Sequence, residues 1–216
     1  MSYIAIIDYG LGNTQSICNA LDALESKYLL TRDRDEILNS SGLILPGVGA
    51  YSEGMRLLKK YNLDDIIKEY TVQGKPLLGI CLGMQLLLQE SEEFGHTQGL
   101  GLIKGKVIRF PLTSSISLKL PHIGWSPIKH SLTEKGTSLL SGINNLEDMY
   151  FVHSYITILD NPTEVLCTTE YAGLEFCSIL KKENIFASQF HPEKSATPGL
   201  QILKNFNYIC KDYSND

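Results

Sequence analysis

The sequence predicts a single three-layer α/β domain, in which helices flank a mixed, mostly parallel sheet. In the first half of the chain, short apolar segments alternate with amphipathic ones, which is typical of parallel strands joined by right-handed helical crossovers. In the second half, strand-like segments follow one another with only turn residues between them. A length of 216 residues suits one domain with an ample core, so we expect residues 1–216 to form a single domain.

Four buried strands are predicted in the first half, because short runs there are almost wholly apolar. They cover residues 3–8, 28–31, 42–45 and 77–80. Between them apolar side chains recur at helical spacing, and Asn13 is a suitable N-cap for the first helix. The predicted helices cover residues 14–24, 35–39, 52–61, 63–73 and 82–90.

The second half is predicted to consist mainly of strands, which cover residues 107–110, 149–155, 165–170, 176–181 and 185–190. Only residues 198–212 have a clear helical pattern, with apolar side chains on one face. Neither a repeat nor a linker interrupts the chain.

Cys81 is the strongest candidate for chemistry. It stands between an apolar run and a helix-like segment, and Gly79 and Gly83 flank it. A strand that turns sharply into a helix between small residues exposes a nucleophile, and a helix N-terminus favours thiolate over thiol. The remaining cysteines lie in apolar segments, where core packing is the expected role. They are Cys18, Cys167, Cys177 and Cys210.

His191 and Glu193 could complete a nucleophilic centre. They are two residues apart at the end of a predicted strand, so their side chains should point the same way. Cysteine, histidine and glutamate can act as nucleophile, general acid and base, and orienting group. A zinc site is the alternative, but the chain has no Cys-x-x-Cys or His-x-x-x-His spacing. We expect no metal.

Two glycine-containing segments follow predicted strands at the edge of the sheet where a site should lie. Residues 8–13 lack the third glycine of a dinucleotide-binding loop, so we expect no cofactor. Residues 45–50 contain Val48 between two glycines, and such a turn can point successive N–H groups into one concavity. Beside Cys81 it would form an oxyanion hole, with the Leu82 N–H as a second donor. A plain tight turn is the alternative.

Composition excludes several classes of protein. A formal net charge of −5 without a basic stripe argues against nucleic-acid binding. No apolar run reaches the ~18 residues that span a membrane. The five cysteines are unpatterned, which suggests a reducing compartment, and the first residues lack the features of a secretory signal. We expect a cytoplasmic protein that binds neither nucleic acid nor membrane.

Taken together, residues 81–85 and 191–193 resemble the motifs of the class I (triad) glutamine amidotransferases, which release ammonia from glutamine for a synthase. The resemblance implies a flavodoxin-like core and glutamine as the substrate. A narrower resemblance, from residue 7 to about residue 206, is to the glutaminase subunits of imidazole glycerol phosphate synthases. The segments that carry it are residues 7–13, 46–49, 121–125, 150–155 and 189–195.

This resemblance implies a role for each matching residue. The triad would be Cys81, His191 and Glu193. The oxyanion hole would be formed by Val48, Gly49 and Leu82. The glutamine pocket would contain Gln85, Glu93, Ser154 and Tyr155. The products would be glutamate and ammonia, released through a cysteinyl thioester.

A chain of this size leaves no room for the synthase, so a separate partner subunit is expected. An ammonia passage must begin near the triad, and three segments there follow predicted strand ends. We therefore expect the partner to dock over Asn13, Trp125 and Lys194. Trp125 would suit an interface anchor, although a core role is the alternative. Lys194 should point away from the triad.

The identity of that partner is left open by two departures from the histidine-pathway pattern. Ser126 stands where asparagine is usual, and residues 171–173 contain one residue more than the usual Tyr-Gly. The expected partner is a barrel cyclase of histidine biosynthesis, and the alternative is a sugar amidotransferase of bacterial surface polysaccharide synthesis. A peptidase or chaperone-like hydrolase is disfavoured by Gln85 and residues 152–155. A catalytically silent binding subunit would have an incomplete triad.

Overall fold

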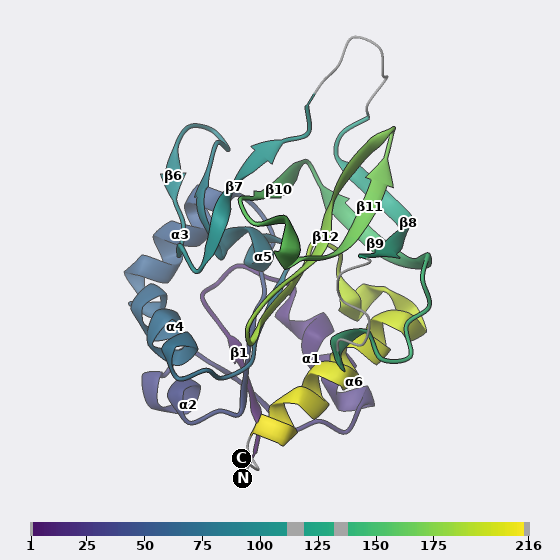
Figure 1. Cartoon of the computed structure of the whole chain (residues 1–216). Helices are drawn as coiled ribbons and strands as arrows, with labels where there is room; N and C mark the ends of the chain where they lie inside the picture. Colours follow the sequence, from purple (N-terminus) through teal and green to yellow (C-terminus); the bar gives the residue numbers. More distant parts are fainter. Residues whose placement is uncertain (1, 112–118, 132–137, 214–216) are drawn as a thin grey trace.

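The computed structural model describes residues 2–111, 119–131 and 138–213 and shows one α/β domain with a mixed sheet between helices, as predicted (Figure 1). The remaining residues of the expected 1–216 domain lie outside this description. In the described part, the main sheet has nine strands in the order β2-β1-β3-β4-β13-β12-β11-β8-β9. A second sheet has four strands in the order β10-β7-β5-β6.

The first half of the main sheet is parallel, with the order expected of a flavodoxin-like core. Its strands are β1 (Ile4–Ile7), β2 (Tyr28–Thr31), β3 (Gly42–Leu45), β4 (Leu77–Ile80) and β13 (Ile185–Ser188). All residues of β1, β3, β4 and β13 are buried, as expected for parallel strands covered on both faces.

The second half of the main sheet is antiparallel. It contains β12 (Leu174–Lys182), β11 (Val165–Tyr171), β8 (His122–His130) and β9 (Glu147–His153). The sheet is therefore mixed, but parallel pairing is less dominant than predicted. Strand β8 was not predicted, because Gly124 and Pro127 are poor strand formers; its pairing with β9 overrides that local preference.

The second sheet is the main feature that sequence analysis missed. It contains β5 (Leu88–Ser91), β6 (Thr97–Gln98), β7 (Ile103–Arg109) and β10 (Tyr155–Leu159). The helix predicted at 82–90 is wrong beyond Leu86, because residues 88–91 pair with β7 instead. The strand predicted at 149–155 is two strands, since the chain leaves the main sheet after His153 and enters the second sheet at Tyr155.

Helices cover both faces of the parallel part (Figure 1). They are α1 (Thr14–Ala23), α2 (Arg34–Leu38), α3 (Tyr51–Lys60), α4 (Leu63–Val72), α5 (Leu82–Leu86) and α6 (Ala196–Tyr213). Alternation along β1 divides the core. Ile4 and Ile6 pack in the cluster that contains residues of α1 and α6, whereas Ala5 and Ile7 pack with α3 and α4. The predicted cap is present, since the Asn13 side chain accepts a hydrogen bond from the Ser16 N–H.

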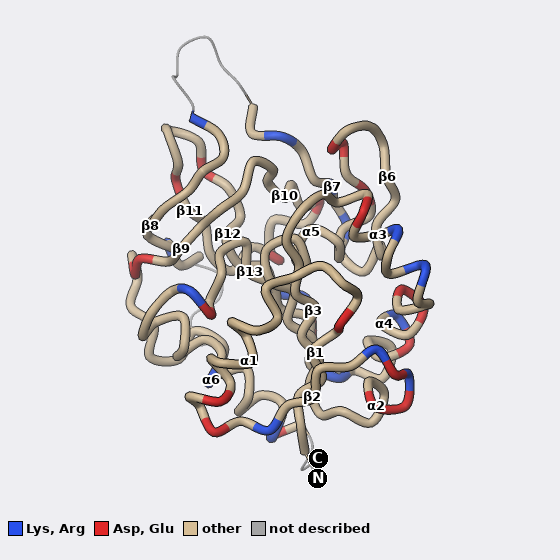
Figure 2. Tube along the Cα trace, turned by 180° about the vertical axis from the view of Figure 1, so that it is seen from behind, with Lys and Arg blue, Asp and Glu red and all other residues tan. Residues whose placement is uncertain are grey.

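Charged residues of both signs are interspersed along the outer helices and loops of the described chain (Figure 2). None of the described helices is both long enough and apolar enough to cross a membrane.

Candidate active site

Cys81 lies at the sharp turn between β4 and α5, as predicted, with φ of 54° and ψ of −109°. Positive φ is unusual for a residue with a side chain, and such strain is typical of nucleophile elbows. The flanking glycines make the turn possible. A Cβ on Gly83 would overlap the Leu45 carbonyl, and a Cβ on Gly79 would lie 3.0 Å from the Gly83 carbonyl. Without side chains at both positions, α5 packs directly against the strands.

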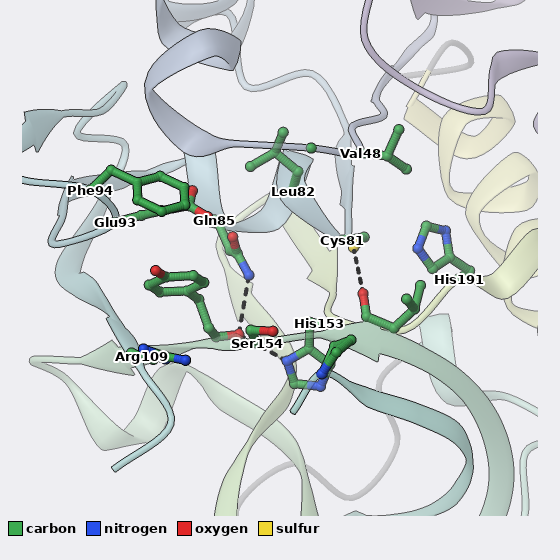
Figure 3. A pocket seen from close by; sticks show the side chains of 14 residues that line it. Val48, Cys81, Leu82, Gln85, Glu93, Phe94, Arg109, His153, Ser154 and His191 are labelled. Atoms are coloured by element: carbon green, nitrogen blue, oxygen red, sulfur yellow. Dashed lines mark hydrogen bonds between the residues drawn. The ribbon is translucent and has the colours of Figure 1, made fainter. Parts of the chain in front are cut away.

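Cys81 is 6% exposed, and its thiol has two polar neighbours. Its Sγ lies 4.0 Å from the Val152 carbonyl oxygen (Figure 3). The Gln189 side-chain amide donates to Sγ at 3.8 Å. Gln189 belongs to residues 189–195, one of the segments that carry the family resemblance, but no role was predicted for it. The other four cysteines are buried in the two core clusters, in agreement with the packing role predicted for them.

His191 and Glu193 form a buried pair. The imidazole Nδ1 lies 2.8 Å from Glu193 Oε1, and the two side chains are only 2% and 1% exposed. Their local structure differs from the prediction, because β13 ends at Ser188 and residues Pro192–Lys194 form a 3₁₀ turn. The Lys194 N–H donates to the His191 carbonyl at 3.0 Å, which closes this turn. The turn, and not an extended strand, brings the two side chains together.

This pairing orients the imidazole toward Cys81. A carboxylate can only accept, so Nδ1 carries the proton and Nε2 is left facing the thiol (Figure 3). Nε2 has no partner within hydrogen-bond distance among the described residues. Burial by itself lowers the pKa of His191, but the adjacent Cys81 and Glu193 outweigh burial and raise it to about 10. The imidazole is therefore suited to hold a proton next to the thiol at neutral pH.

The turn at residues 46–49 lies beside Cys81, and one of the donors expected in the oxyanion hole is already occupied by this turn. The Leu82 N–H donates to the Gly47 carbonyl at 3.3 Å. Because C=O and N–H point in opposite directions across a trans peptide, the Val48 N–H points away from Leu82. The Tyr9 hydroxyl donates to the Pro46 carbonyl at 2.8 Å and holds the turn from the other side.

A cavity of about 550 Å³ opens at the thiol (Figure 3). It brings together most of the residues singled out from the sequence: Val48, Gly49, Cys81, Leu82, Gln85, Glu93, Ser154, Tyr155 and His191. Glu193 lies behind His191 and does not line the cavity. The Gln85 side-chain amide donates to the Tyr155 carbonyl at 3.2 Å and to Gln189 Oε1 at 3.0 Å.

The far end of the cavity carries two opposite charges. Glu93 accepts a hydrogen bond from the Tyr51 N–H, and burial raises the pKa of Glu93 although that bond opposes the shift. Arg109, the last residue of β7, lines the same cavity, as does Phe94, which is 86% exposed. Arg109 and Phe94 were missed because neither belongs to a sequence motif. Only the second sheet brings them to the cavity.

The three residues expected at a partner interface lie on adjacent elements. Asn13 caps α1, which packs against the 192–194 turn; this turn packs against β9, and β9 pairs with β8. Trp125 on β8 packs edge-on against Tyr150, with 5.9 Å between the ring centroids. Its side chain is 52% exposed, so the core role considered for it is wrong. Lys194 is exposed.

A cysteine on a strained elbow, a buried histidine–glutamate pair and a cavity that both reach define the geometry of a thiol-dependent hydrolase. The family model described as "Glutamine amidotransferase class-I" matches residues 5–210, and the chain belongs to this family.

The chain is also similar to curated proteins that carry the name "Imidazole glycerol phosphate synthase subunit HisH". That of Bacillus cereus is 42% identical over 212 residues, which cover 98% of this chain and 97% of the relative. That of Caldanaerobacter subterraneus subsp. tengcongensis is 46% identical over 209 residues, with coverage of 96% and 98%. That of Moorella thermoacetica is 44% identical over 215 residues, with coverage of 100% and 99%.

Solved structures share the fold at low sequence identity. A structure described as a glutamine amidotransferase has a TM-score of 0.74 at 17% identity and covers 97% of this chain and 100% of that chain. PurLQS from Thermotoga maritima has a TM-score of 0.68 at 19% identity, with coverage of 99% and 100%. The fold class predicted from the sequence is thereby confirmed.

Proposed function

We propose that this chain is the glutaminase subunit of an imidazole glycerol phosphate synthase. It would hydrolyse glutamine to glutamate and ammonia and deliver the ammonia to a cyclase subunit in histidine biosynthesis, in the cytoplasm. The observation that carries the chemistry is that Cys81 and His191 line one cavity while Glu193 binds His191 from behind. The synthase assignment rests on near full-length similarity to subunits of that name.

In the first half of the reaction, the thiolate of Cys81 attacks the carboxamide carbon of glutamine, and the carbonyl oxygen becomes an oxyanion. The amide nitrogen cannot leave as NH₂⁻, so it needs a proton. His191 Nε2 faces the thiol and, with a pKa of about 10, can hold that proton at neutral pH. Proton transfer releases NH₃ and leaves a glutamyl thioester on Cys81.

In the second half, His191 is neutral and accepts a proton from water at Nε2. The resulting hydroxide attacks the thioester, the carbon–sulfur bond breaks, and glutamate leaves. The Cys81 thiolate and the protonated His191 are restored. Throughout both halves, Glu193 Oε1 accepts a hydrogen bond from His191 Nδ1–H, with 2.8 Å between Nδ1 and Oε1. This bond keeps Nε2 directed at the reacting atoms.

The charges in the cavity suit a free amino acid. Glutamine is a zwitterion, and recognition of it requires an anion for the ammonium group and a cation for the carboxylate. Glu93 provides the first and Arg109 the second, at the end of the cavity opposite Cys81 (Figure 3). Gln85, Ser154 and Tyr155 line the space between, where the side chain of glutamine would lie.

Ammonia must reach the partner unprotonated, so the docking surface should lie next to the triad. Asn13, Trp125 and Lys194 would form this surface. The 192–194 turn packs against both α1 and β9, β9 pairs with β8, and Lys194 follows Glu193 directly. A half-exposed tryptophan supports this placement, because tryptophan is enriched at the energetic centre of interfaces.

Reconstitution with candidate synthases tests the proposal. The purified chain is mixed with a barrel cyclase of histidine biosynthesis and its acceptor, and glutamine-dependent product formation is followed. We expect synthesis from glutamine with this partner and none with a surface-sugar amidotransferase. Synthesis with only the sugar enzyme would assign the chain to that pathway. Absence of glutamine hydrolysis with either partner would reject the glutaminase assignment.

A further inference from the structure

Behind the cavity, three buried polar side chains form a continuous hydrogen-bonded chain. Ser126 Oγ lies 2.9 Å from His122 Nε2, and His122 Nδ1 lies 3.1 Å from His153 Nε2. His153 Nδ1 lies 2.8 Å from the Tyr155 carbonyl oxygen. Ser126 and His122 are on β8, and His153 ends β9 at the wall of the cavity.

The carbonyl at the end of this chain determines the direction of every bond in it. A carbonyl oxygen can only accept, so His153 carries its proton on Nδ1. A neutral His153 then accepts at Nε2 from His122 Nδ1–H, and His122 accepts at Nε2 from the Ser126 hydroxyl. Burial keeps both rings neutral, since it lowers the pKa of His122 to about 4 and that of His153 to about 3.

The Tyr155 carbonyl also accepts from the Gln85 amide, at 3.2 Å. Gln85 donates in turn to Gln189, and Gln189 donates to Cys81 Sγ. A continuous series of hydrogen bonds therefore connects the Ser126 hydroxyl to the Cys81 thiol. The shared carbonyl belongs to the corner where the chain passes from one sheet to the other, and Ser154 at this corner lines the cavity (Figure 3).

We propose that Ser126 and His122 are positioning residues for the glutamine pocket. Through His153 they hold the corner at Ser154 and the carbonyl of Tyr155, and through that carbonyl they orient the Gln85 amide. Neither residue lines the cavity, so neither contacts substrate directly. The inference rests on the proposed glutaminase function and adds residues on β8 that act behind the pocket.

Ring stacking allows the nitrogens of His122 to be tested separately from its packing. The imidazole lies between Tyr171, at 4.0 Å between ring centroids, and Phe151, at 5.0 Å. His122→Phe keeps an aromatic ring there and removes both nitrogens. Ser126→Ala removes only the hydroxyl, and Ser126→Thr restores it. Ser178→Ala is the matched control, because Ser178 is fully buried and its hydroxyl has no partner among the described residues.

Steady-state glutamine hydrolysis by the complex with the synthase partner is the first measurement. We expect Ser126→Ala and His122→Phe to raise KM for glutamine by about fivefold or more with little change in kcat, as the loss of one positioning hydrogen bond would. Ser126→Thr should restore KM, and Ser178→Ala should leave it unchanged. Thermal unfolding of each variant separates this effect from instability.

Nitrogen NMR of the histidine rings gives a readout that does not depend on activity. At neutral pH, His122 and His153 should both be neutral with the proton on Nδ1, and Ser126→Ala should change the His122 signals. An Nε2–H form of His153, or an unchanged KM in folded Ser126→Ala and His122→Phe, would overturn the inference. An inactive wild-type complex would instead reject the proposed glutaminase function, and the NMR result would still stand.

Discussion

The Leu82 N–H donates to the carbonyl oxygen of Gly47 at 3.3 Å, so a donor expected in the oxyanion hole is occupied by the protein itself. Rotation of the Gly47–Val48 peptide would free Leu82 and turn the Val48 N–H toward the cavity. Glycine at position 47 permits such rotation more readily than other residues do.

We therefore predict weak glutaminase activity for the isolated chain and strong activity once the partner and its acceptor are bound. One oxyanion donor is worth roughly 100- to 1,000-fold in kcat, so activation of about that size is expected. Rates of glutamate formation with and without the partner test this directly. Equal rates would mean that the turn does not control activity.

Replacement of Cys81 by serine or alanine should reduce glutamine hydrolysis roughly 1,000-fold or more, since no other group can form the thioester. The fold should remain intact, because the side chain is small and lies at a cavity. The matched control is Cys18→Ala, a buried cysteine on α1 outside the site. Substantial turnover by Cys81→Ala in the complex would show that another residue is the nucleophile.

Arg109→Gln should raise KM for glutamine about tenfold or more, because a charge-assisted contact to the substrate carboxylate is lost. We expect a smaller effect on kcat, since Arg109 lies at the end of the cavity away from the thiol. Lys104→Gln is the control, as Lys104 is an exposed residue of the same strand that does not line the cavity. An unchanged KM for Arg109→Gln would remove this residue from glutamine recognition.

Lys194→Glu should weaken complex formation or uncouple glutamine hydrolysis from synthesis, while added ammonium salts still support the synthase. In the proposed complex the exposed Lys194 would lie at the start of the ammonia passage, so reversal of its charge should repel a partner that the lysine attracts. Lys59→Glu on α3 is the control for net charge. Binding is measured by titration calorimetry. Normal binding and coupling by Lys194→Glu would place the docking surface elsewhere.

The free energy of unfolding should decrease as pH falls from 6.5 toward 4. The folded-state pKa of His122 is about 4 and that of His153 about 3, whereas the ordinary value is 6.5. Between pH 6.5 and 4, His122 and His153 bind protons in the unfolded chain but stay neutral in the folded chain. The free energy of unfolding therefore falls on acidification. Each imidazole contributes at most about 1.4 kcal/mol per pH unit.

Urea unfolding at pH values of about 7, 6 and 5 measures this slope. His122→Phe should have a shallower dependence than the wild type, because one of the rings whose pKa is lowered by burial is gone. An identical slope in the two proteins would show that His122 is not held neutral by the fold.

Local sequence determined the parts of this protein that depend on neighbours along the chain. The apolar runs predicted the buried parallel strands, and Gly79 and Gly83 predicted the elbow at Cys81, because the close approach there is set by residues within one turn. The motifs around Cys81 and His191 likewise indicated the family. Both are short segments whose chemistry is evident from residue type and spacing.

Tertiary structure decided what depends on distant pairing. Residues 88–91 have a helical pattern but form a strand, because β7 offers unpaired backbone groups that outweigh a weak local preference. The resulting second sheet brings Arg109 and Phe94 to the cavity. The Ser126–His122–His153 chain likewise exists only because β8 pairs with β9, which places His122 opposite His153. Such contacts join residues about 30 positions apart. The periodicity of a helix or strand relates only near neighbours along the chain, so it cannot predict these contacts.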